Sequence, residues 1–507
     1  MQMGVTEAEL RRLFLLSLGG LGVVASLLGL FLGAGLANIL ARAVTGFSDA
    51  LPAIPLDRWV VGKAMGSALL VCLIGGWLAC RRESPVANPR IGGGIYWTLS
   101  ALIVLAGAHG LFMAETLLGG FAAIAGVAVL ALVSISPLLS GLKKLSRHLR
   151  GSLLSRMGLR ELLWYPGDLA IAIGALVLAL ATSVAMALMV DSFRSDFEAM
   201  LEQRVVNDLF VSAGAGRDLS ALADQLEALP GVSRVQRYGQ IAWSIEGRTV
   251  TIGYSGFDQQ EGRRYGLPGP LPPGAALVSE RLARELELAA GARLLIEDLP
   301  LTVAAVFPGY GDSTPRLIVR TEDAVRLGVS PRFDRLSIDA EAPPGLMDVI
   351  REWAPGVDVE AQGAIRDRAL GIFDQTFAIT RALTFLALIV ASVGLYNALL
   401  ALELLQQPAR HLLHTMGLTA GEARIIAGWR VIGIGGASLV LALPLGVLMG
   451  WLLCAVINPR AFGWSLVLQL QSESFLWPLC SALLVMILVG LAPTPKEPGE
   501  EAGQNVA

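Results

Sequence analysis

Residues 365–380 read IRDRALGIFDQTFAIT, and an apolar run from Ala382 to Leu402 follows them directly. The next segment, residues 403–424, is polar and reads ELLQQPARHLLHTMGLTAGEAR. A second long apolar run then leads to VINPRAFGW at residues 456–464. An apolar run of about 20 residues is long enough to cross a bilayer as a helix. This stretch therefore predicts the joint between a water-exposed domain and a membrane bundle, with a cytoplasmic turn between two spanning helices.

The composition is that of a membrane protein. The chain has 507 residues, of which 54% are hydrophobic and only 16% are charged, and its mean hydropathy is +0.62. These values lie outside the range of ordinary soluble domains. The net charge of −3 argues against nucleic-acid binding, which needs a basic face. The four cysteines lie inside or beside apolar runs without metal-ligand spacing, so we expect neither a disulfide framework nor a zinc site.

Hydropathy predicts a polytopic α-helical membrane protein with about eight spans. The expected spans cover residues 13–40, 62–80, 94–113, 117–140, 167–190, 377–402, 424–456 and 474–493. Lys and Arg residues gather in three short segments: before the first span, after the second, and between the fourth and fifth. Because such residues mark cytoplasmic loops, we expect both termini in the cytoplasm and residues 191–376 on the opposite side of the membrane.

Residues 191–376 have the pattern of a small α+β domain inserted between the fifth and sixth spans. Expected strands are residues 207–212, 233–245, 249–254, 294–296, 302–306, 316–319 and 335–338, and expected helices are residues 218–229, 280–288 and 345–353. Both ends of the domain reach the adjacent spans with little linker. We therefore expect a stalk of helices that continue from the membrane into the domain, which could carry movement across the bilayer.

An internal repeat is a further prediction. The sequence Met3-Gly4-Val5-Thr6 matches Met416-Gly417-Leu418-Thr419, and at the same offset Gly20 and Gly22 fall on Gly433 and Gly435. The alternative is that glycine-rich spans resemble one another by composition alone. If the repeat is real, we expect the chain to begin partway into a first copy, whose leading span and outward domain would be lost by truncation or supplied by a separate chain.

Motifs for catalysis and for ion-coupled transport are absent from the sequence. It contains no GxxxxGK[ST] phosphate-binding loop, no HExxH and no GxSxG, and its four histidines are not paired as ligands. Carboxylates in the middle of the expected spans, which ion-coupled transporters usually need, are also missing. We expect no catalytic, cofactor-binding or metal-binding residue in this chain, so energy for any work would come from outside it.

Residues 160–493 resemble a permease unit of the FtsX-like family, the membrane subunits of MacB- and Lol-type ABC transporters. The resemblance is carried by GLRELLWYPGDLAIAIGALVLALA, LVSERLARELELAAGARLLI, IFDQTFAITRALTFLALIVASVGLYNALLALELL, HTMGLT and VINPRAFGW, in that order along the chain. It implies one span, a MacB-like periplasmic domain and then three spans, a unit that occurs twice in larger members. One departure is Pro408-Ala409, where the family usually has an Arg-Glu pair before the glycine that is Gly417 here.

This resemblance implies a domain plan for the whole chain. The expected parts are the end of a first repeat at 1–61, a span and cytoplasmic loop at 62–92, two inter-repeat spans at 93–142, a cytoplasmic amphipathic segment at 143–166, the fifth span at 167–190, the periplasmic domain with its stalk at 191–376, three FtsX-like spans at 377–493 and a disordered cytoplasmic tail at 494–507.

The resemblance also implies a function. The expected protein is the permease subunit of a mechanotransmitting transporter in a bacterial inner membrane, in which a separate ATPase dimer holds ATP and Mg²⁺. Its expected partners are that ATPase, a second permease half or a second copy, membrane lipids, and a periplasmic adaptor or lipoprotein; the cargo would be periplasmic or lipid-linked. Two alternatives stay open at this point: a transmembrane regulator that activates a periplasmic cell-wall enzyme, and an ATP-independent receptor or scaffold.

Three sets of residues are the candidates for these roles. We expect contact with the ATPase along the amphipathic segment 407–424, which is either a solvated loop with an interfacial helix or a short coupling helix; the candidates are Glu403, Arg410, His411, Met416, Gly417 and Glu422. The expected stalk hinge is Phe373, Phe377 and Thr380. The expected anchor at the outer membrane edge is Phe462, Gly463 and Trp464, for which an ordinary aromatic belt is the alternative.

Overall fold

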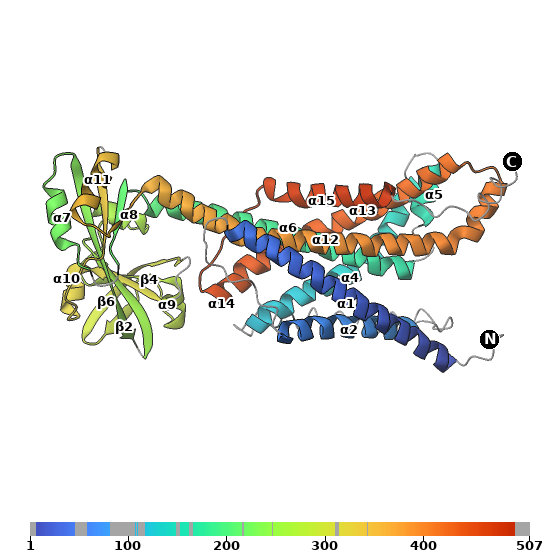
Figure 1. Cartoon of the computed structure of the whole chain (residues 1–507), viewed down its shortest axis with the longest axis horizontal. Coiled ribbons are helices and arrows are strands. Elements are labelled where there is room, and N and C mark those ends of the chain that lie inside the picture. Colours follow the sequence, from blue (N-terminus) through green and yellow to red (C-terminus); the bar gives the residue numbers. More distant parts are fainter. Residues whose placement is uncertain are drawn as a thin grey trace. The chain divides into compact units, whose positions relative to one another are not determined.

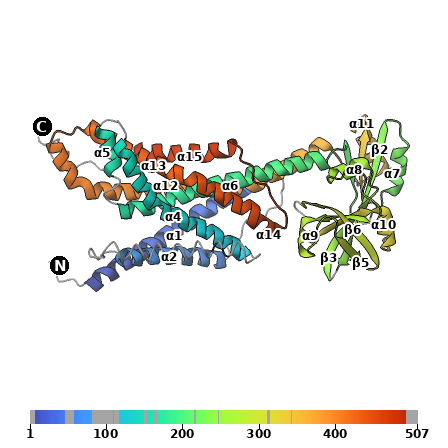
Figure 2. The same cartoon turned by 180° about the vertical axis from the view of Figure 1, so that it is seen from behind.

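The computed structural model of the chain has two compact units, residues 1–99 and residues 100–507 (Figures 1 and 2). The structure describes residues 7–45, 58–81, 107, 109, 117–148, 153–161, 166–214, 217–245, 247–309, 314–341 and 343–491. The predicted span at 94–113 therefore lies outside the described residues, apart from 107 and 109, and so does the predicted tail at 494–507.

The first unit is a pair of helices, α1 (Glu7–Thr45) and α2 (Arg58–Arg81). The helices approach each other at Gly22 of α1, where an added Cβ would lie 3.4 Å from the Cβ of Cys72. Large apolar side chains such as Leu16 and Phe31 are exposed over the rest of α1, as expected for a surface that faces lipid. Gly22 aligns with Gly435 in the predicted repeat, and Gly435 likewise faces a following helix, at Met486. The repeat itself stays a prediction.

The helices of the second unit cover the predicted spans at 117–140, 167–190, 377–402 and 424–456, and most of the one at 474–493. The helices are α4 (Leu117–His148), α5 (Leu153–Glu161), α6 (Pro166–Arg204), α12 (Gln362–Thr415), α13 (Ala420–Leu452), the π-helical turn η1 (Leu453–Ile457), α14 (Asn458–Phe462) and α15 (Glu473–Leu491). In the described part of both units, five stretches of helix are long and apolar enough to cross a membrane: Arg12–Gly35, Leu117–Ile135, Ile173–Arg204, Gln362–Ala401 and Gly421–Phe462. The polytopic helical class is thus confirmed, while the count of eight spans stays a prediction.

Helix α6 is at the centre of the bundle. Its residues Ile173, Leu176 and Leu188 have exposed fractions of 0–1% because α4, α12, α13 and α15 all pack around it. The closest approach is to α13, at Gly446. An added Cβ there would lie 2.7 Å from the Cβ of Val184 and 2.9 Å from the carbonyl oxygen of Ala181. In a membrane, where helices gain little from hydrophobic exclusion, such backbone contact through small residues is a main source of packing energy.

The domain between α6 and α12 is a nine-stranded sheet with short helices, which confirms the predicted α+β insertion. The strands are β1 (Leu209–Ser212), β2 (Val232–Ile245), β3 (Arg248–Ser255), β4 (Ala275–Ser279), β5 (Arg293–Ile296), β6 (Leu299–Phe307), β7 (Arg316–Arg320), β8 (Arg335–Ala340) and β9 (Asp358–Ala361). Their order is β5-β6-β4-β7-β3-β2-β8-β1-β9, with β3–β7 and β4–β6 parallel and the other pairs antiparallel. The helices are α7 (Ser220–Glu227), α8 (Gln259–Arg264), α9 (Glu280–Glu285), α10 (Thr321–Arg326) and α11 (Pro343–Trp353).

Four elements of this domain were missed by the sequence pattern: β4, β9, α8 and α10. All five residues of β4 are buried, so this strand lacks the alternation of a half-exposed strand. Strand β9 has only four residues, and α8 and α10 have six each, which gives a weak periodic signal. Shortness alone does not explain the misses, because β1, β5 and α9 are equally short and were predicted.

Enlarging Gly446 should destabilise the bundle. We expect Gly446→Val to lower the free energy of unfolding by about 1–3 kcal/mol, the usual cost of overpacking a filled interface, because the new methyl groups meet Val184 and the backbone of α6. Thermal unfolding of the detergent-purified chain measures the effect. Gly436→Val is the matched control, because Gly436 lies on an exposed part of α13 with no neighbouring atom within 4 Å of its Cβ position. Equal unfolding temperatures for the two variants would contradict the prediction.

Candidate functional site: the joint between stalk and bundle

The two helices that carry the domain are held together by an aromatic cluster. Phe193 and Phe197 lie one turn apart on α6, and Phe373 and Phe377 lie one turn apart on α12. Ring centroids are 5.1 Å apart for Phe193–Phe373, 5.7 Å for Phe193–Phe377 and 5.8 Å for Phe197–Phe373. These separations are typical of favourable edge-to-face and offset pairs. We call these four rings the stalk cluster.

An ion pair beside the stalk cluster fixes how the two helices face each other. Arg194 of α6 donates to Asp374 of α12 at 2.5 Å and to Glu198 at 3.0 Å. Farther out, Arg366 donates to Glu202 at 3.0 Å. The side chains of Arg194 and Asp374 are 40% and 43% exposed. Such exposed pairs contribute about 0–1 kcal/mol, so burial of the rings stabilises the stalk more than the charges do.

The outer end of the stalk is built into the domain by buried polar groups. Asn207 donates to Asp339 at 2.6 Å and accepts from Arg264, which also pairs with Glu261 at 3.0 Å. The exposed fractions of the Arg264 and Glu261 side chains are 6% and 3%, and burial raises the pKa of Glu261. Removing one partner of a buried pair is costly because the other charge is left without compensation. This junction is therefore rigid.

The polypeptide after α14 lies against the stalk. Trp464 stacks on Phe193 with a centroid distance of 6.4 Å. The backbone N–H of Gln469 donates to the hydroxyl of Ser192 at 2.9 Å, and its side chain donates to Asp196 at 3.0 Å. The connection between α14 and α15 is thus attached along one side of α6.

The same connection also contacts the domain directly, through α9. Glu280 accepts hydrogen bonds from the backbone N–H of Ser465 at 2.5 Å and from its hydroxyl at 2.7 Å. Arg284 donates to the carbonyl of Pro459, and Gly463, with a φ of +89°, lies against the side chain of Arg281. We call this set, which comprises Glu280, Arg281, Arg284, Pro459, Gly463 and Ser465, the clasp. It is a second connection between domain and bundle, separate from the stalk.

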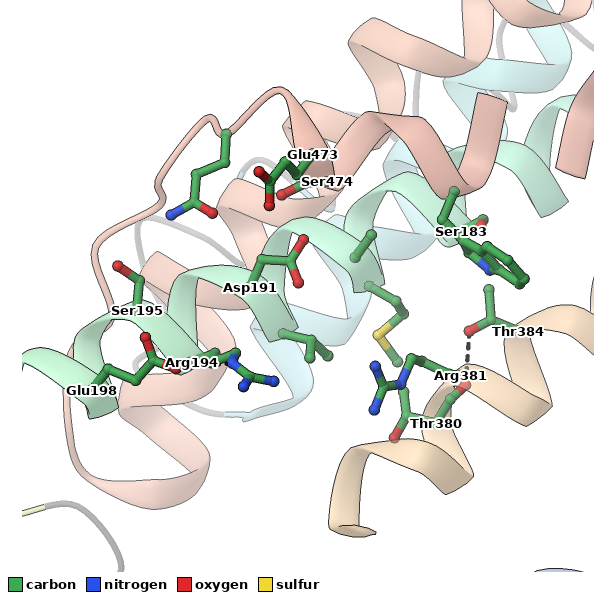
Figure 3. A pocket seen from close by; sticks show the side chains of 15 residues that line it. Ser183, Asp191, Arg194, Ser195, Glu198, Thr380, Arg381, Thr384, Glu473 and Ser474 are labelled. Carbon is green, nitrogen blue, oxygen red and sulfur yellow. Dashed lines mark hydrogen bonds and ion pairs between the residues drawn. The ribbon is translucent and has the colours of Figure 1, made fainter. Parts of the chain in front are cut away.

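The residues expected at the hinge and at the membrane edge meet at this joint. Phe373 and Phe377 belong to the stalk cluster, and Thr380 lines a cavity at its inner side (Figure 3). Helix α12 runs through all three positions without a break, so a hinge there stays a prediction. Of the three expected anchor residues, Phe462 and Trp464 stack on each other at 5.4 Å, and Trp464 and Gly463 contact the stalk and the clasp. An ordinary aromatic belt does not account for those contacts.

The expected ATPase-contact segment is not a separate short helix. Helix α12 continues to Thr415 and ends in a turn at Met416 and Gly417, whose φ is +99°. Residues 403–415 include four Leu and two Gln, which favour helix, and the helix continues through them although Pro408 disfavours a helix interior. Glu403, Arg410 and His411 lie on this part of α12, and their side chains are outside the described part of the chain.

Helix α13 begins directly after this turn with a capping box. Thr419 accepts from the N–H of Glu422 at 3.3 Å, and the Glu422 carboxylate accepts from the N–H of Thr419 at 2.9 Å. Met416, at 77% exposure, is the prominent apolar side chain of the turn. The structure thus places Met416, Gly417 and Glu422 together at the end of the bundle opposite the domain, while their contact with an ATPase stays a prediction.

Sequence reasoning did not find several residues of the joint, notably Phe193, Phe197, Glu280 and Arg284. The two phenylalanines had a usable signal, because they stand four residues apart on a helix leaving the membrane. The clasp had none, because Glu280 meets Ser465 across 185 residues of sequence. Among the described residues no group of three or more His, Cys, Asp or Glu side chains is placed to hold a metal ion.

Comparison with known proteins agrees with this architecture. Residues 169–361 match the MacB-like periplasmic core domain. Over 377 residues the chain is 27% identical to an ABC transporter permease protein, Rv0987, of Mycobacterium tuberculosis. The chain is related to ABC transporter permeases. The match covers 67% of this chain and 43% of Rv0987, so the chain spans less than half the length of that relative.

A solved structure was also found: the extracellular domain of the noncanonic ABC-type transporter YknZ from Gram-positive bacteria. Sequence identity is 10%, the match covers 30% of this chain and 99% of that domain, and the TM-score is 0.22. The predicted relation to MacB-type permeases is confirmed by the domain match and by the permease relative.

Truncating Phe373 should weaken the stalk. We expect Phe373→Ala to lower the free energy of unfolding by about 3–5 kcal/mol, the usual cost of removing a buried ring, because Phe373 is 6% exposed and contacts three other rings. Ile372→Ala is the matched control, because the neighbouring Ile372 is 59% exposed. Thermal unfolding of both variants tests this; a loss at Ile372 as large as that at Phe373 would argue against the stalk cluster.

Breaking the clasp should free the connection after α14 without unfolding the domain. In Glu280→Ala we expect faster hydrogen exchange at the amide of Ser465, because its acceptor is gone, and unchanged exchange in strand β3. Mass-spectrometric hydrogen exchange on the full chain measures both. Glu322→Ala on α10, which removes an exposed carboxylate of the same domain, serves as control. If Ser465 exchanges equally fast in the wild type and in both variants, the clasp is not closed in solution.

Proposed function

We propose that the chain is the permease subunit of an ABC-type transporter of the MacB and Lol kind, in the inner membrane of a bacterium. A separate ATPase dimer binds ATP and Mg²⁺, and the permease converts movement of that dimer into movement of the sheet domain. The work done is export or extraction of a periplasmic or lipid-linked substrate. Support comes from the permease relative and the MacB-like domain match.

The main structural support for this proposal is that two connections, the stalk and the clasp, join the bundle to the domain. Helices α6 and α12 run without interruption from the bundle into the domain, and the clasp joins the domain to the end of the helices α13 and α14. At 1.5 Å per residue, the 54 residues of α12 extend about 80 Å. A displacement at the turn between α12 and α13 can therefore reach the domain along α12, while the clasp, which consists of exposed contacts, opens or closes. A receptor with an independently mobile outer domain needs neither connection.

The proposed orientation is supported by the positive charges of the short loops. With those loops in the cytoplasm, the turn at Met416 and Gly417 faces the ATPase and the sheet domain lies in the periplasm. A second permease half or a second copy of this chain completes the transporter, and an adaptor or lipoprotein in the periplasm meets the sheet domain. No nucleotide is held by this chain.

Cross-linking from the turn tests the contact with an ATPase. We expect Met416→Cys to cross-link to a co-expressed ABC ATPase subunit and Trp353→Cys, on the sheet domain, not to do so. The exposed fractions of the two side chains are 77% and 45%, so both are accessible to the reagent. Cross-linking from Trp353→Cys alone, or labelling of Trp353→Cys from the cytoplasmic side of sealed vesicles, would overturn the orientation and with it the proposed function.

Locking the clasp tests whether movement of the domain matters. A short bismaleimide joining Glu280→Cys to Ser465→Cys should abolish transport in proteoliposomes that contain the ATPase, while ATP hydrolysis continues. Each single cysteine variant treated with the same reagent is the control. If ATP activates a periplasmic cell-wall hydrolase in this assay and no cargo is transported, the chain is a transmembrane regulator of that enzyme and not a transporter subunit. ATP hydrolysis by the purified chain alone would contradict both.

A further inference from the structure

A cavity of about 680 Å³ lies between α6, α12 and α15, where the stalk leaves the bundle (Figure 3). Along α6 its lining changes from apolar to charged. Met186 and Ala187 line the part within the bundle, together with Trp477 of α15, whereas Asp191 and Arg194 line the part toward the stalk. A cavity with an apolar inner end and a charged outer end, at the edge of a membrane bundle, has the polarity of an amphiphile such as a lipid.

The charged groups at the outer end are only partly engaged by the protein. Figure 3 shows Asp191 and Arg194 on α6, Arg381 on α12 and Glu473 at the start of α15 around one space. Arg194 is held by Asp374 and Glu198, and Arg381 donates one long bond, of 3.4 Å, to the carbonyl of Asp374. Among the described residues, the carboxylates of Asp191 and Glu473 have no hydrogen-bond or ion-pair partner. Two carboxylates without a partner and a guanidinium that makes one long hydrogen bond thus line the same cavity, a set of charges that matches a ligand carrying both an ammonium and a phosphate.

Two buried hydroxyls in the same lining also point to a ligand. Ser183 and Ser474 are each 2% exposed, and neither hydroxyl oxygen has a hydrogen-bond partner within the described part of the chain. Buried polar groups are almost always paired, so an unpartnered hydroxyl in the lining of a cavity is available to hydrogen-bond a ligand there. Ser183 lies eight residues, or about 12 Å along the helix, from Asp191, beyond Met186 and Ala187. Ser474 directly follows Glu473, so of the two hydroxyls it is the one at the charged end of the cavity.

We propose that this cavity binds a phospholipid with a primary amine, that is, a phosphatidylethanolamine from the outer leaflet. Its ammonium pairs with Asp191 and Glu473, its phosphate pairs with Arg381, and its first chain carbons lie on Met186, Ala187 and Trp477. Because Arg194 lines the cavity and also joins α6 to α12, the bound lipid contacts the ion pair that orients the stalk. This inference rests on the membrane orientation of the proposed function and does not depend on the ATPase. Failure of the ATPase cross-link would therefore not contradict it.

Lipid retention by the full chain tests the proposal. The purified chain is exchanged into an equimolar mixture of phosphatidylethanolamine, phosphatidylcholine and phosphatidylglycerol with identical acyl chains, and bound lipid is counted by native mass spectrometry. We expect the wild type to retain phosphatidylethanolamine about tenfold over phosphatidylglycerol, which has no amine, as for one charge-assisted pair. Phosphatidylcholine should be intermediate, because its quaternary amine is charged but donates no N–H bond. Equal retention of all three lipids by the wild type would overturn the proposal without any variant.

Substitutions then locate the site. The double variant Asp191→Asn with Glu473→Gln should bring the ratio of phosphatidylethanolamine to phosphatidylglycerol close to one. The matched control, Asp348→Asn with Glu352→Gln, removes two exposed carboxylates from α11 and should keep the tenfold preference. Ala187→Trp fills the apolar end and should lower retention of every lipid. If Asp191→Asn with Glu473→Gln keeps the preference for phosphatidylethanolamine, or if Ala187→Trp retains as much lipid as the wild type, the lipid binds elsewhere and the proposal is wrong. Detection of a bound peptide instead of a lipid would also contradict it.

Discussion

Close packing of α6 against its neighbours is the constraint on which the rest of the second unit depends. Within a bilayer this packing cannot come from hydrophobic exclusion alone, so it needs backbone approach through small residues, and Gly446 of α13 provides it. Where α6 leaves the bundle it is held by rings instead, with Phe193 and Phe197 packed against Phe373 and Phe377 of α12. One helix thus carries two kinds of packing.

The domain is connected to the bundle twice, and the two connections differ in kind. The stalk is covalent and continuous, and its outer end is fixed by Asn207 and the buried pair of Glu261 and Arg264. The clasp is a small set of exposed polar contacts from α9 to the connection after α14. A small set of exposed contacts is easily opened, whereas a buried network is not. Movement between bundle and domain is therefore expected at the clasp, with the stalk acting as the rigid part.

The hydropathy pattern predicted the long helices well, because a span needs about 20 apolar residues and few other structures do. The domain insertion, and the strands with clear alternation such as β2 and β3, were predicted for a similar reason. Where the pattern was weak the prediction failed. Strand β4 is buried on both faces and was missed. The polar end of α12 was expected to be a loop with an interfacial helix or a short coupling helix, but α12 continues through it, although Pro408 disfavours a helix interior. Phe373 and Phe377 were found because they stand at the change from polar to apolar sequence, but their partner Phe193 was not.

The sequence by itself determined that this is a membrane protein with one inserted α+β domain, because apolar run length and strand alternation are local properties that each segment carries alone. Only the tertiary structure decided that Glu280 meets Ser465, that Trp464 rests on Phe193, and that Ser183, Asp191, Arg381 and Glu473 share one cavity. These contacts join segments that are far apart along the chain, and each side chain involved is chemically ordinary. Their positions are set by how α6, α12 and α15 pack, and no local pattern in the sequence encodes that packing.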